Sequence, residues 1–314
     1  MTANAPPGLT FVVPALNEAE SLPQLFDEIR AACHTVDKTF EVIVIDDGSS
    51  DGTVDAVRTA RADDPRIRLI SFTRNFGKAA AYTAAFRRAR GALVVTMDAD
   101  LQDDPSELPK LLMELEDQDV VVGWKMHRMG NEPTKTLPSR VFNRMNRLVF
   151  GVAFRDQNSG YRIMRREVAH ALELSGDNYR FIPQLAHLAG FRVGEVGVLH
   201  RKRVHGVSKY GVTRFWTGML DLLTVGFLAR FRHRPLHFFG TVGLLPISVG
   251  VGLLIYVLGM KLAGDNFSQH LAALIIGVTS LLIGVQSILI GLVAELLAAP
   301  QGDQFVVDRD VSDA

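Results

Sequence analysis

Two aspartates, Asp98 and Asp100, follow directly on an apolar run and are separated by a single residue. Residues two apart in an extended chain project to the same side, so their carboxylates lie next to each other. Two neighbouring carboxylates repel unless a proton or a cation separates them. Because Mg²⁺ binds proteins through one or two carboxylates together with substrate phosphates, the spacing suits a divalent metal that neutralises a diphosphate. On its own, Asp-x-Asp is a weak signal.

The acids that come next have a structural explanation. Asp104, Pro105 and Glu107 occupy the N-cap, the first position and the third position of an expected helix start. This is a capping-box arrangement. Asp104 and Glu107 are therefore expected to begin a helix, which leaves Asp98 and Asp100 as the candidate ligands.

A second acidic stretch, residues 45–53, reads "IDDGSSDGT" and starts like a calcium loop. A calcium loop opening at Asp47 needs Glu at its twelfth position, where this chain has Arg58. Ser49, Ser50 and Asp51 are better explained by turn and helix-cap chemistry. Asp46 and Asp47 remain as acceptors for a base N–H or for ribose hydroxyls.

The apolar runs before these acids alternate with helical stretches. Strands are expected at residues 9–14, 40–45, 67–72 and 92–97, and helices at 20–34, 53–62, 78–90 and 106–116. Apolar runs separated by helices predict an α/β fold whose mostly parallel sheet has helices on both faces. Ligands of such sheets bind outside the carboxyl ends of the strands. One shared site is therefore expected there, formed by Asn17 and Glu18, Asp46 and Asp47, Arg74 and Asn75, and Asp98 and Asp100.

At the end of the first expected strand, Asn17 and Glu20 have the spacing of a helix cap. Glu18 between them is then the freer ligand candidate. Further along, residues 121–135 are interpreted as a lid over the site, with a plain surface connection as the alternative.

Two stretches near the end of the chain, residues 236–260 and 271–294, contain no charged side chain. At about 1.5 Å per residue, each is long enough to cross a hydrocarbon layer of about 30 Å. Buried core helices are the alternative, but core helices of this length usually show a polar face. The short connection predicts a transmembrane hairpin. Arg230, Arg232 and Arg234 precede it, so the positive-inside rule places the larger part of the chain in the cytosol, at the face of the inner, cytoplasmic membrane.

Residues 212–234 are apolar with arginines at both ends, and they are interpreted as a helix at the membrane interface that inserts Trp216 among the headgroups. A packed soluble helix is the alternative. The predicted organisation is a cytosolic domain at 1–211, an interfacial helix region at 212–235, a transmembrane hairpin at 236–298 and a polar cytosolic tail at 299–314. The first residues lack the pattern of a signal peptide.

The net charge is zero, but the charges are segregated along the chain. Residues 1–119 hold 12 Lys and Arg against 21 Asp and Glu, whereas residues 120–235 hold 20 against 7. An acidic half joined to a basic half indicates a cation site beside an anion site. The basic half could bind nucleic acid or anionic lipid, and its position next to the membrane favours lipid. Cys33 is the single cysteine, which excludes an internal disulfide and fits a reducing compartment.

No other catalytic pattern is present in the sequence. It contains no HExxH, no metal-binding Cys/His spacing, no P-loop and no GxSxG. The Gln-x-x-Arg-Trp signature of processive polysaccharide synthases is also missing.

Six motifs together resemble family 2 glycosyltransferases, and more narrowly polyprenyl-phosphate glycosyltransferases such as dolichyl-phosphate mannose synthases and bacterial undecaprenyl-phosphate sugar transferases. In chain order they are "VVPALNE", "VIDDGSSDGT", "RNFGKAAA", "MDADLQDDPSELP", "DQNSGYRIMRREV" and "RVHGVSKYG". The resemblance covers residues 9–215 and extends over the hairpin to membrane-anchored bacterial forms. It implies the single-sheet GT-A fold, which is Rossmann-like.

The resemblance also implies roles for the residues that match its motifs. The nucleoside pocket would be lined by Pro14, Glu18 and Asp46, although Leu16 stands where the family often has a stacking aromatic residue. Mg²⁺ or Mn²⁺ would be held by Asp98 and Asp100, with Asp100 the direct ligand and Gln102 nearby.

On the acceptor side, the resemblance places Asp156 beside the acceptor, with a loop cap as the alternative. The phosphates of donor or lipid would be bound by Arg203, Ser208 and Lys209, which could otherwise form a solvated basic face, and by Arg140 on the loop before the acceptor site.

The sequence thus predicts a metal-dependent, inverting transferase that moves a sugar from a UDP- or GDP-sugar to polyprenyl phosphate for the cell envelope. A metal ion and arginines would stabilise the leaving diphosphate, and the anionic lipid phosphate needs no strong base. One alternative is a hydroxyl acceptor, which would make Asp156 a true base. Another is a non-catalytic membrane scaffold or flippase partner. The sugar, the base, the choice of metal and homo-oligomer formation stay open.

Overall fold

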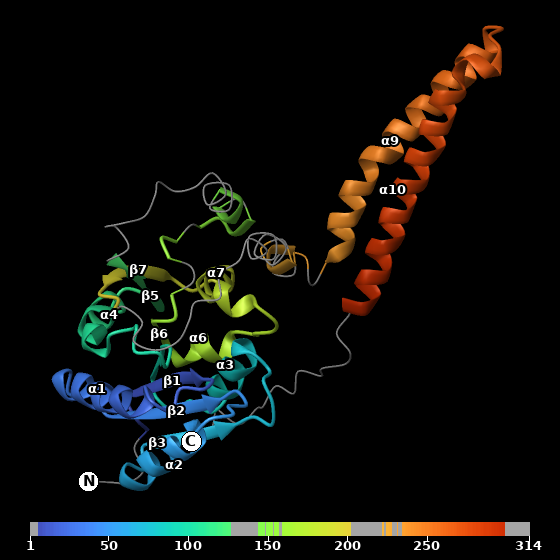
Figure 1. Ribbon diagram of the computed structural model, residues 1–314. Helices are drawn as coiled ribbons and strands as arrows, with labels where there is room; N and C mark the ends of the chain where they lie inside the picture. Colours follow the sequence, from blue (N-terminus) through green and yellow to red (C-terminus); the bar gives the residue numbers. More distant parts are fainter. Residues whose placement is uncertain are drawn as a thin grey trace, which may run out of the picture. The chain divides into compact units, whose positions relative to one another are not determined.

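The computed structural model describes residues 6–126, 144–147, 149–152, 154–156, 159–201, 222, 224–227, 231 and 234–298 (Figure 1). The chain divides into two compact units, residues 1–226 and residues 227–314. The first is built around a sheet and the second around a pair of long helices.

The sheet of the first unit has seven strands in the order β3-β2-β1-β4-β6-β5-β7. Strands β3, β2, β1 and β4 are parallel, β6 runs antiparallel between β4 and β5, and β7 is parallel to β5. Their bounds are β1 Leu9–Ala15, β2 Phe40–Asp46, β3 Ile67–Ser71, β4 Leu93–Thr96, β5 Val120–Lys125, β6 Arg162–Arg165 and β7 Val193–Val198. The predicted α/β fold with a mostly parallel sheet is confirmed.

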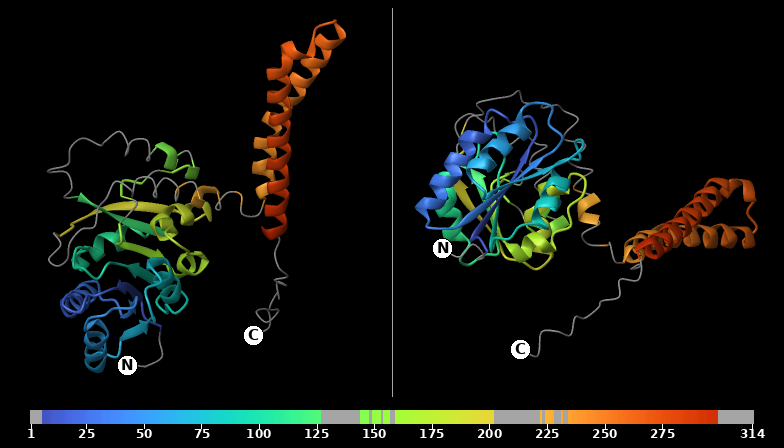
Figure 2. Two further views of the ribbon diagram at one scale, coloured as in Figure 1. Left: turned by 45° about the vertical axis from the view of Figure 1, so that its right-hand side comes forward. Right: turned by 90° about the horizontal axis from the view of Figure 1, so that it is seen from below.

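Helices cover both faces of this sheet (Figure 2). One face packs against α1 Leu22–Thr35, α2 Thr53–Asp63 and α4 Leu108–Glu114, and the other against α3 Lys78–Phe86, α6 Arg166–Ala171 and α7 Ile182–Leu188. Short 3-10 helices, η1 Pro105–Glu107 and η3 Asn178–Phe181, lead into α4 and α7.

Successive side chains of a strand point to opposite faces of the sheet, so neighbouring residues pack into two different hydrophobic cores. In β1, Phe11 and Val13 join the core under α1, whereas Val12 between them joins the core under α3. All three are fully buried. Burying each such side chain stabilises the fold by about 1.5–3 kcal/mol, so a strand buried on both faces must be apolar throughout. The four expected strands and the four helices that follow them are confirmed.

The strands of the basic half were not predicted. The expected lid at residues 121–135 is wrong for residues 121–125, because they lie inside β5, where Val120, Val121 and Val122 are fully buried in the sheet. Residues 127–135 lie outside the described residues.

The second unit is a hairpin of two long helices, α9 Pro235–Leu262 and α10 Leu271–Ala298, joined through η4 Phe267–His270. Both are long and apolar enough to cross a membrane. Only 17% of the most apolar 18-residue stretch of α9, and 11% of that of α10, is buried inside the structure. The helices pack antiparallel, since a Cβ added to Gly243 would lie 2.8 Å from the carbonyl oxygen of Gly284, and one added further along α9, at Gly250, would lie 2.7 Å from that of Gly277. The predicted hairpin is confirmed, and length, composition and exposure together fit a membrane protein.

Candidate active site

The two candidate metal ligands stand where β4 ends. The register between β4 and β6 places Thr96 opposite Arg162, and the Thr96 hydroxyl donates to the carbonyl of Gly160 at 2.7 Å. A Cβ added to Gly160 would lie 3.0 Å from both Cγ and Oδ1 of Asp98. Glycine at position 160 therefore allows the backbone just before β6 to lie directly against the Asp98 carboxylate.

Asp98 is paired with a lysine at the start of α3. Lys78 Nζ lies 2.7 Å from Asp98 Oδ1. Burial alone would raise the pKa of the Asp98 carboxyl, but the charge and hydrogen bond of Lys78, with the charges of Lys125 and Arg162, outweigh burial and lower it. Burial alone would lower the pKa of Lys78, but the charge and hydrogen bond of Asp98, with the charges of Tyr82 and Tyr179, together outweigh burial, so the pKa of Lys78 is raised. Both partners are therefore ionised, and an ammonium group relieves the repulsion expected between Asp98 and Asp100.

Asp100 is half-buried, and its Oδ1 accepts the backbone N–H of Gln102 at 3.2 Å. The turn between them is possible because Leu101 adopts a left-handed backbone with φ of 59°. A non-glycine residue in that region costs about 1–3 kcal/mol, and such strain concentrates at functional sites. The metal-motif loop, defined as residues 98–104, is therefore held in a conformation that its own sequence does not favour.

The donor set fits a metal ion that shares its ligands with a substrate. Within the described ranges, no group of three or more His, Cys, Asp or Glu side chains gathers to hold a metal. Mg²⁺ needs only one or two carboxylates when substrate phosphates and water complete its coordination. Asp100, with Asp98 fixed beside it, meets that requirement.

The two aspartates at the end of β2, Asp46 and Asp47, accept hydrogen bonds from within the protein. Asp46 is buried, and its carboxylate accepts the N–H of Ser49 at 3.0 Å and the hydroxyl of Ser71 at 2.9 Å. Asp47 accepts the N–H groups of Phe76 at 2.7 Å and Gly77 at 3.0 Å. Asp47 thus holds the backbone that leads into α3, and its contact with a nucleoside stays a prediction. Asp46 is the last residue of β2 and therefore lies at the carboxyl edge of the sheet, where the shared site was predicted.

The loop after β1 is tied to the loop after β2. Asn17 Oδ1 accepts the N–H of Ser50 at 2.9 Å, and the N–H of Glu18 donates to the hydroxyl of Thr53 at 2.9 Å. The prediction that Asn17 and Glu20 cap the first helix is wrong, because α1 begins at Leu22 and Asn17 reaches across to the neighbouring loop instead. These bonds bring Glu18 close to the end of β2, on the side where Asp46 stands.

Two further predictions concern residues around Glu18. Its carboxylate accepts the hydroxyl of Ser21 at 2.8 Å. Pro14 is buried within β1, opposite Ile45 of β2, whereas Leu16 is 43% exposed beyond the strand end. An exposed aliphatic side chain thus occupies the place of the missing aromatic residue.

Two of the acids make the predicted local contacts: Asp104 caps a helix, and Asp51 forms the turn just before α2, whose N-cap is Gly52. The Asp104 carboxylate accepts the N–H of Ser106 at 2.9 Å and begins η1. Asp51 accepts the N–H of Thr53 at 2.9 Å at the start of α2. Glu107 pairs with Lys110, at 2.6 Å.

Asp156 lies on the loop that Gly160 brings to Asp98. The N–H of the preceding residue, Arg155, donates to Oε1 of Glu195 in β7 at 2.7 Å. Burial raises the pKa of Glu195 and the charge of Asp156 adds to the rise, although the backbone N–H groups of Arg155 and Asp156 oppose it. The Arg155 guanidinium lies 5.0 Å from the ring centroid of Trp124. Strands β5 and β7 therefore position the candidate acceptor loop.

Four predicted phosphate ligands lie outside the described residues: Arg140, Arg203, Ser208 and Lys209. The structure adds two cations that sequence reasoning did not single out, Lys78 and Arg162. Arg162 is 2% exposed, and its Nε and Nη1 have no hydrogen-bond partner in the described part of the chain. Both residues belong to motifs, "RNFGKAAA" and "DQNSGYRIMRREV", that the sequence analysis quoted without giving these positions a role.

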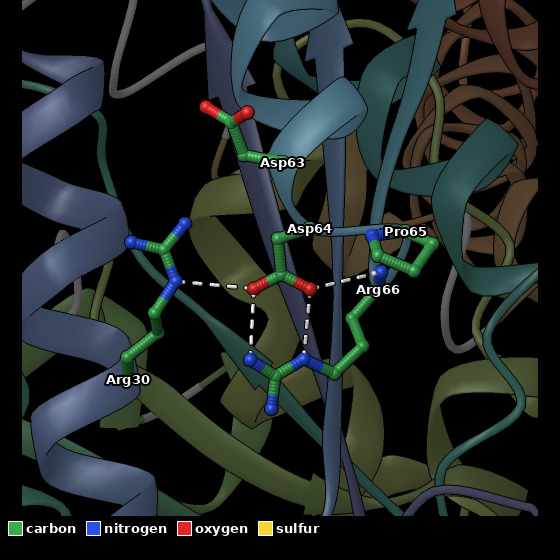
Figure 3. Close-up of a pocket in the computed structure, with 5 residues that line it drawn as sticks. All are labelled: Arg30, Asp63, Asp64, Pro65 and Arg66. Atoms are coloured by element: carbon green, nitrogen blue, oxygen red, sulfur yellow. Dashed lines mark hydrogen bonds and ion pairs between the residues drawn. The ribbon is translucent and has the colours of Figure 1, made fainter.

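The surface also has a hollow lined by Arg30, Asp63, Asp64, Pro65 and Arg66, and its polar contacts stabilise the fold. Asp64 accepts Nε of Arg30 at 3.1 Å and a bidentate pair of N–H groups from Arg66 at 2.8 Å (Figure 3). The cluster precedes β3, so it lies at the amino end of the strands, away from the acids described above. Its charges satisfy one another.

The sequence has related proteins of known activity. The model of the family "Glycosyl transferase family 2" matches residues 10–172. A dodecaprenyl-phosphate galacturonate synthase of Rhizobium johnstonii is 37% identical over 92% of this chain and 87% of that protein. An undecaprenyl-phosphate 4-deoxy-4-formamido-L-arabinose transferase of Pseudomonas syringae is 34% identical over 85% of this chain and 80% of that protein.

Solved structures share the fold. The mannosyltransferase PcManGT of Pyrobaculum calidifontis, in complex with GDP-Man and Mn²⁺, covers 95% of this chain and 81% of its own at a TM-score of 0.51 and 21% identity. The glucosyl-3-phosphoglycerate synthase of Mycobacterium tuberculosis, with Mn²⁺ and UDP-glucose, covers 71% and 79% at a TM-score of 0.52 and 19% identity. The predicted GT-A architecture is thereby confirmed.

Proposed function

The chain belongs to glycosyl transferase family 2, and on that premise we propose that it moves a sugar from a nucleotide-sugar donor to a polyprenyl phosphate at the cytosolic face of a bacterial inner membrane. The main support is the identity to a dodecaprenyl-phosphate galacturonate synthase, which extends over 92% of the chain and so includes the hairpin. The contact between Gly160 and Asp98 supports it further, because Asp156 precedes Gly160 by only four residues.

The donor would bind at the carboxyl edge of the sheet. Pro14, Glu18 and Asp46 would line the nucleoside pocket, and Asp100, with Asp98 and Gln102 beside it, would hold Mg²⁺ or Mn²⁺ on the diphosphate. A divalent cation bound there would stabilise the charge of the leaving diphosphate. Lys78 keeps Asp98 ionised and fixed, so the acidic motif is ready before the donor arrives.

The acceptor would approach from the loop of residues 154–160. A lipid phosphate is already anionic, and one of its oxygens would attack the anomeric carbon as the bond to the nucleoside diphosphate breaks. A single in-line attack inverts the anomeric configuration. Asp156 would orient the acceptor, and Arg140, Arg203, Ser208 and Lys209 would bind phosphates and stabilise the charge that develops on them.

The test incubates the purified full chain with Mg²⁺ or Mn²⁺, undecaprenyl phosphate and a panel of labelled UDP- and GDP-sugars. The panel includes uronic acids and 4-amino sugars, because relatives handle galacturonate and a formamido-arabinose. We expect a lipid-linked product with one donor. Transfer to a sugar hydroxyl but not to the lipid phosphate would support the alternative acceptor and make Asp156 a base. Folded protein that gives no product with any donor would contradict the proposal.

The Asp100→Ala variant tests the metal motif. We expect transfer to fall by at least about 100-fold, because one lost group that stabilises transition-state charge commonly costs that much. Glu116→Ala, which removes an exposed acid at the end of α4, is the matched control and should keep full activity. Full activity of Asp100→Ala would remove the metal motif from the mechanism.

A further inference from the structure

The metal-motif loop contains a strained residue that the surrounding structure has to hold in place. Leu101 has a left-handed backbone, with φ of 59°. Strained conformations of this kind persist only where their surroundings fix them. The turn at Leu101 matters for the site, because it places the N–H of Gln102 on the Asp100 carboxylate at 3.2 Å. The contacts that hold this loop therefore determine where the candidate metal ligand stands.

One set of contacts comes from the loop itself. The side chain of Leu101 is 3% exposed and packs in the core under α1. Asp103 is also 3% exposed, and its Oδ2 accepts the N–H of Asp98 at 3.3 Å. The Asp103 carboxylate thus closes the loop onto its own first residue. These contacts fix the side of the loop that packs against the core.

A second set of contacts comes from the two residues that we call the brace, residues 200–201, which follow β7 closely. His200 forms an isolated antiparallel bridge with Asp103. The N–H of Arg201 donates to the carbonyl of Gln102 at 2.9 Å. Gln102 is therefore held on both sides, with its N–H bound by Asp100 and its carbonyl bound by the brace.

The side chain of Arg201 joins the loop to a helix. Its Nη1 lies 2.8 and 2.7 Å from the two carboxylate oxygens of Glu28 on α1. Its Nε and Nη2 lie 3.2 and 2.9 Å from the two oxygens of Asp104. Asp104 is the last residue of the metal-motif loop and the N-cap of η1. One guanidinium thus fixes the end of the loop against α1.

The geometry separates this contact from an ordinary surface ion pair. The side chain of Glu28 is 21% exposed and that of Asp104 is 12% exposed. Bidentate pairs of arginine with partly buried carboxylates fix orientation as well as charge, whereas exposed pairs contribute little. Lysine cannot reproduce the planar fork that reaches two carboxylates at once.

We propose that Arg201 is a positioning residue of the metal site, which holds the metal-motif loop in the strained conformation that presents Asp100 to a divalent cation. Its backbone acts on Gln102, and its side chain acts on Asp104. Without Arg201, the loop would spend part of its time in relaxed conformations that bind the cation poorly. The inference rests on the proposed function, because that function places Mg²⁺ or Mn²⁺ at Asp100.

A matched control exists at the other end of the same strand. Just before β7, Arg192 forms a bidentate pair with Asp119, with Nε 3.2 Å and Nη2 3.1 Å from its two oxygens. Asp119 directly precedes β5, at the sheet edge opposite the acids. Arg192→Ala removes an ion pair of the same type from the same strand without touching the metal-motif loop.

The binding test measures Mn²⁺ affinity of the full chain without turnover. Electron paramagnetic resonance follows free Mn²⁺ during titration with UDP or GDP present, and the Mn²⁺ that the nucleotide alone binds is subtracted. We expect Arg201→Ala to weaken Mn²⁺ binding by about tenfold or more, since groups that orient metal ligands commonly change affinity by that much. Arg201→Lys should recover part of the loss, and Arg192→Ala should bind Mn²⁺ as the wild type does.

The kinetic test separates positioning from general stability. Initial rates with undecaprenyl phosphate and the active donor are measured against Mn²⁺ concentration. Arg201→Ala should raise the KM for Mn²⁺ by about tenfold and keep kcat at saturating Mn²⁺ within about threefold. The reason is that binding draws the loop back to the competent conformation, so only the apparent affinity falls. A chain that is merely less stable would lose activity at every Mn²⁺ concentration.

Glu28→Gln keeps the test decisive if Arg201→Ala folds poorly. It removes one negative charge from the α1 side of the contact and leaves the metal-motif loop unchanged in sequence. We expect it to weaken Mn²⁺ binding in the same direction by a smaller factor.

The outcomes separate the two proposals. A wild-type chain that binds Mn²⁺ with a nucleotide but gives no lipid-linked product contradicts the proposed function, and the Mn²⁺ affinities of the variants then decide the inference. A wild-type chain that binds no Mn²⁺ with either nucleotide overturns both. Unchanged Mn²⁺ affinity in Arg201→Ala and Glu28→Gln overturns the inference alone, and so does an equal loss in Arg192→Ala.

Discussion

At the scale of single residues, Lys78 changes how the two aspartates are understood. Two adjacent carboxylates require a cation, and in this structure Lys78 supplies one to Asp98 at 2.7 Å. Asp98 is then held in an ion pair, and Asp100 is the aspartate that we propose as the direct metal ligand. This difference between the two aspartates follows from the fold, because the start of α3 brings Lys78 next to Asp98, which is 20 residues further along the chain.

Replacing Lys78 with Met should lower kcat/KM by about 100-fold, which corresponds to about 2.7 kcal/mol of transition-state free energy. The physical reason is that a partly buried carboxylate without its partner is costly and moves toward other groups. Lys78→Arg should recover about tenfold, since it keeps the charge. Initial rates in the lipid-phosphate assay measure both. Lys110→Met, which removes the ion pair with Glu107 outside the site, is the control, and an equal loss there would contradict a specific role for Lys78.

At this scale, the sequence predicted contacts between residues that are close in the chain, but not contacts between segments that are distant in the chain. The local contacts of Asp104 and Asp51 could be predicted, because each binds an N–H two residues away. Lys78 and Arg201 could not, because their partners belong to distant segments that only the sheet topology brings near. Asn17 shows the same limit, since its partner lies across a loop rather than in the next helix turn.

At the scale of elements, β1, β2 and β4 were predictable because both of their faces are buried almost throughout. The edge strand β3 is mostly only partly buried, but it is apolar at three of its five positions. The later strands give a weaker signal. Strand β6 has four residues and includes the buried Arg162, and most of β7 is only partly buried, with Glu195 and two glycines in it. Strand β5 is apolar, but the residues that follow it, 125–135, are mostly polar. This composition led to the wrong expectation that residues 121–125 belong to a lid. Polar residues and glycines inside β6 and β7 thus explain why these two strands were not predicted.

The connection between α2 and β3 makes a prediction about pH. Hydrogen bonds from Arg66, then Arg30, hold the pKa of Asp64 at about 2, below its unfolded value of about 3.9. The resulting stabilisation, about 1–2 kcal/mol after allowance for the exposed side of Arg66, is present above pH 4 and lost as the pH falls through 2. Asp64→Asn should therefore be less stable at pH 7, with a difference that shrinks as the pH approaches 2.

Urea unfolding of the full chain in detergent, followed by tryptophan fluorescence between pH 7 and pH 3, checks this. Asp55→Asn serves as the control, because its pair with Arg58 is exposed on both sides and should add nothing measurable. A difference between Asp64→Asn and the wild type that stays constant with pH would show that the ion pairs are not the cause.

The two long helices depend on glycines that face each other. A Cβ on Gly284 would lie 2.6 Å from the carbonyl oxygen of Gly243, so the backbones touch where these residues meet. In lipid, helix pairs gain stability from such close packing. Gly284→Leu should separate the helices and lower the thermal midpoint of the hairpin by several degrees in detergent, measured by circular dichroism. Gly252→Leu, where an added Cβ meets nothing within 4 Å, should change it little.

At the scale of the whole molecule, the proposed chemistry requires one orientation in the membrane. Nucleotide sugars are made in the cytosol, so the sheet with its acids has to face that side. The sequence agrees, because Arg230, Arg232 and Arg234 precede α9, whereas its other end has only Lys261 in the last turn and Asp265 in the connection that follows. Positively charged loops remain on the cytosolic side. At the same end of the hairpin, Glu295 accepts the N–H of Leu236 at 3.0 Å, which gives the start of α9 a polar partner close to α10.

Cysteine labelling in intact cells tests that orientation. A cysteine at Asn266, in the connection between the helices, should react with a membrane-impermeant maleimide added from outside, once the outer membrane is opened. A cysteine at the exposed Glu116 should react only after the inner membrane is broken. Cys33 is buried and should give little background. Labelling of position 116 in intact cells would put the acids on the side without nucleotide sugars, and the proposed reaction could then not take place there.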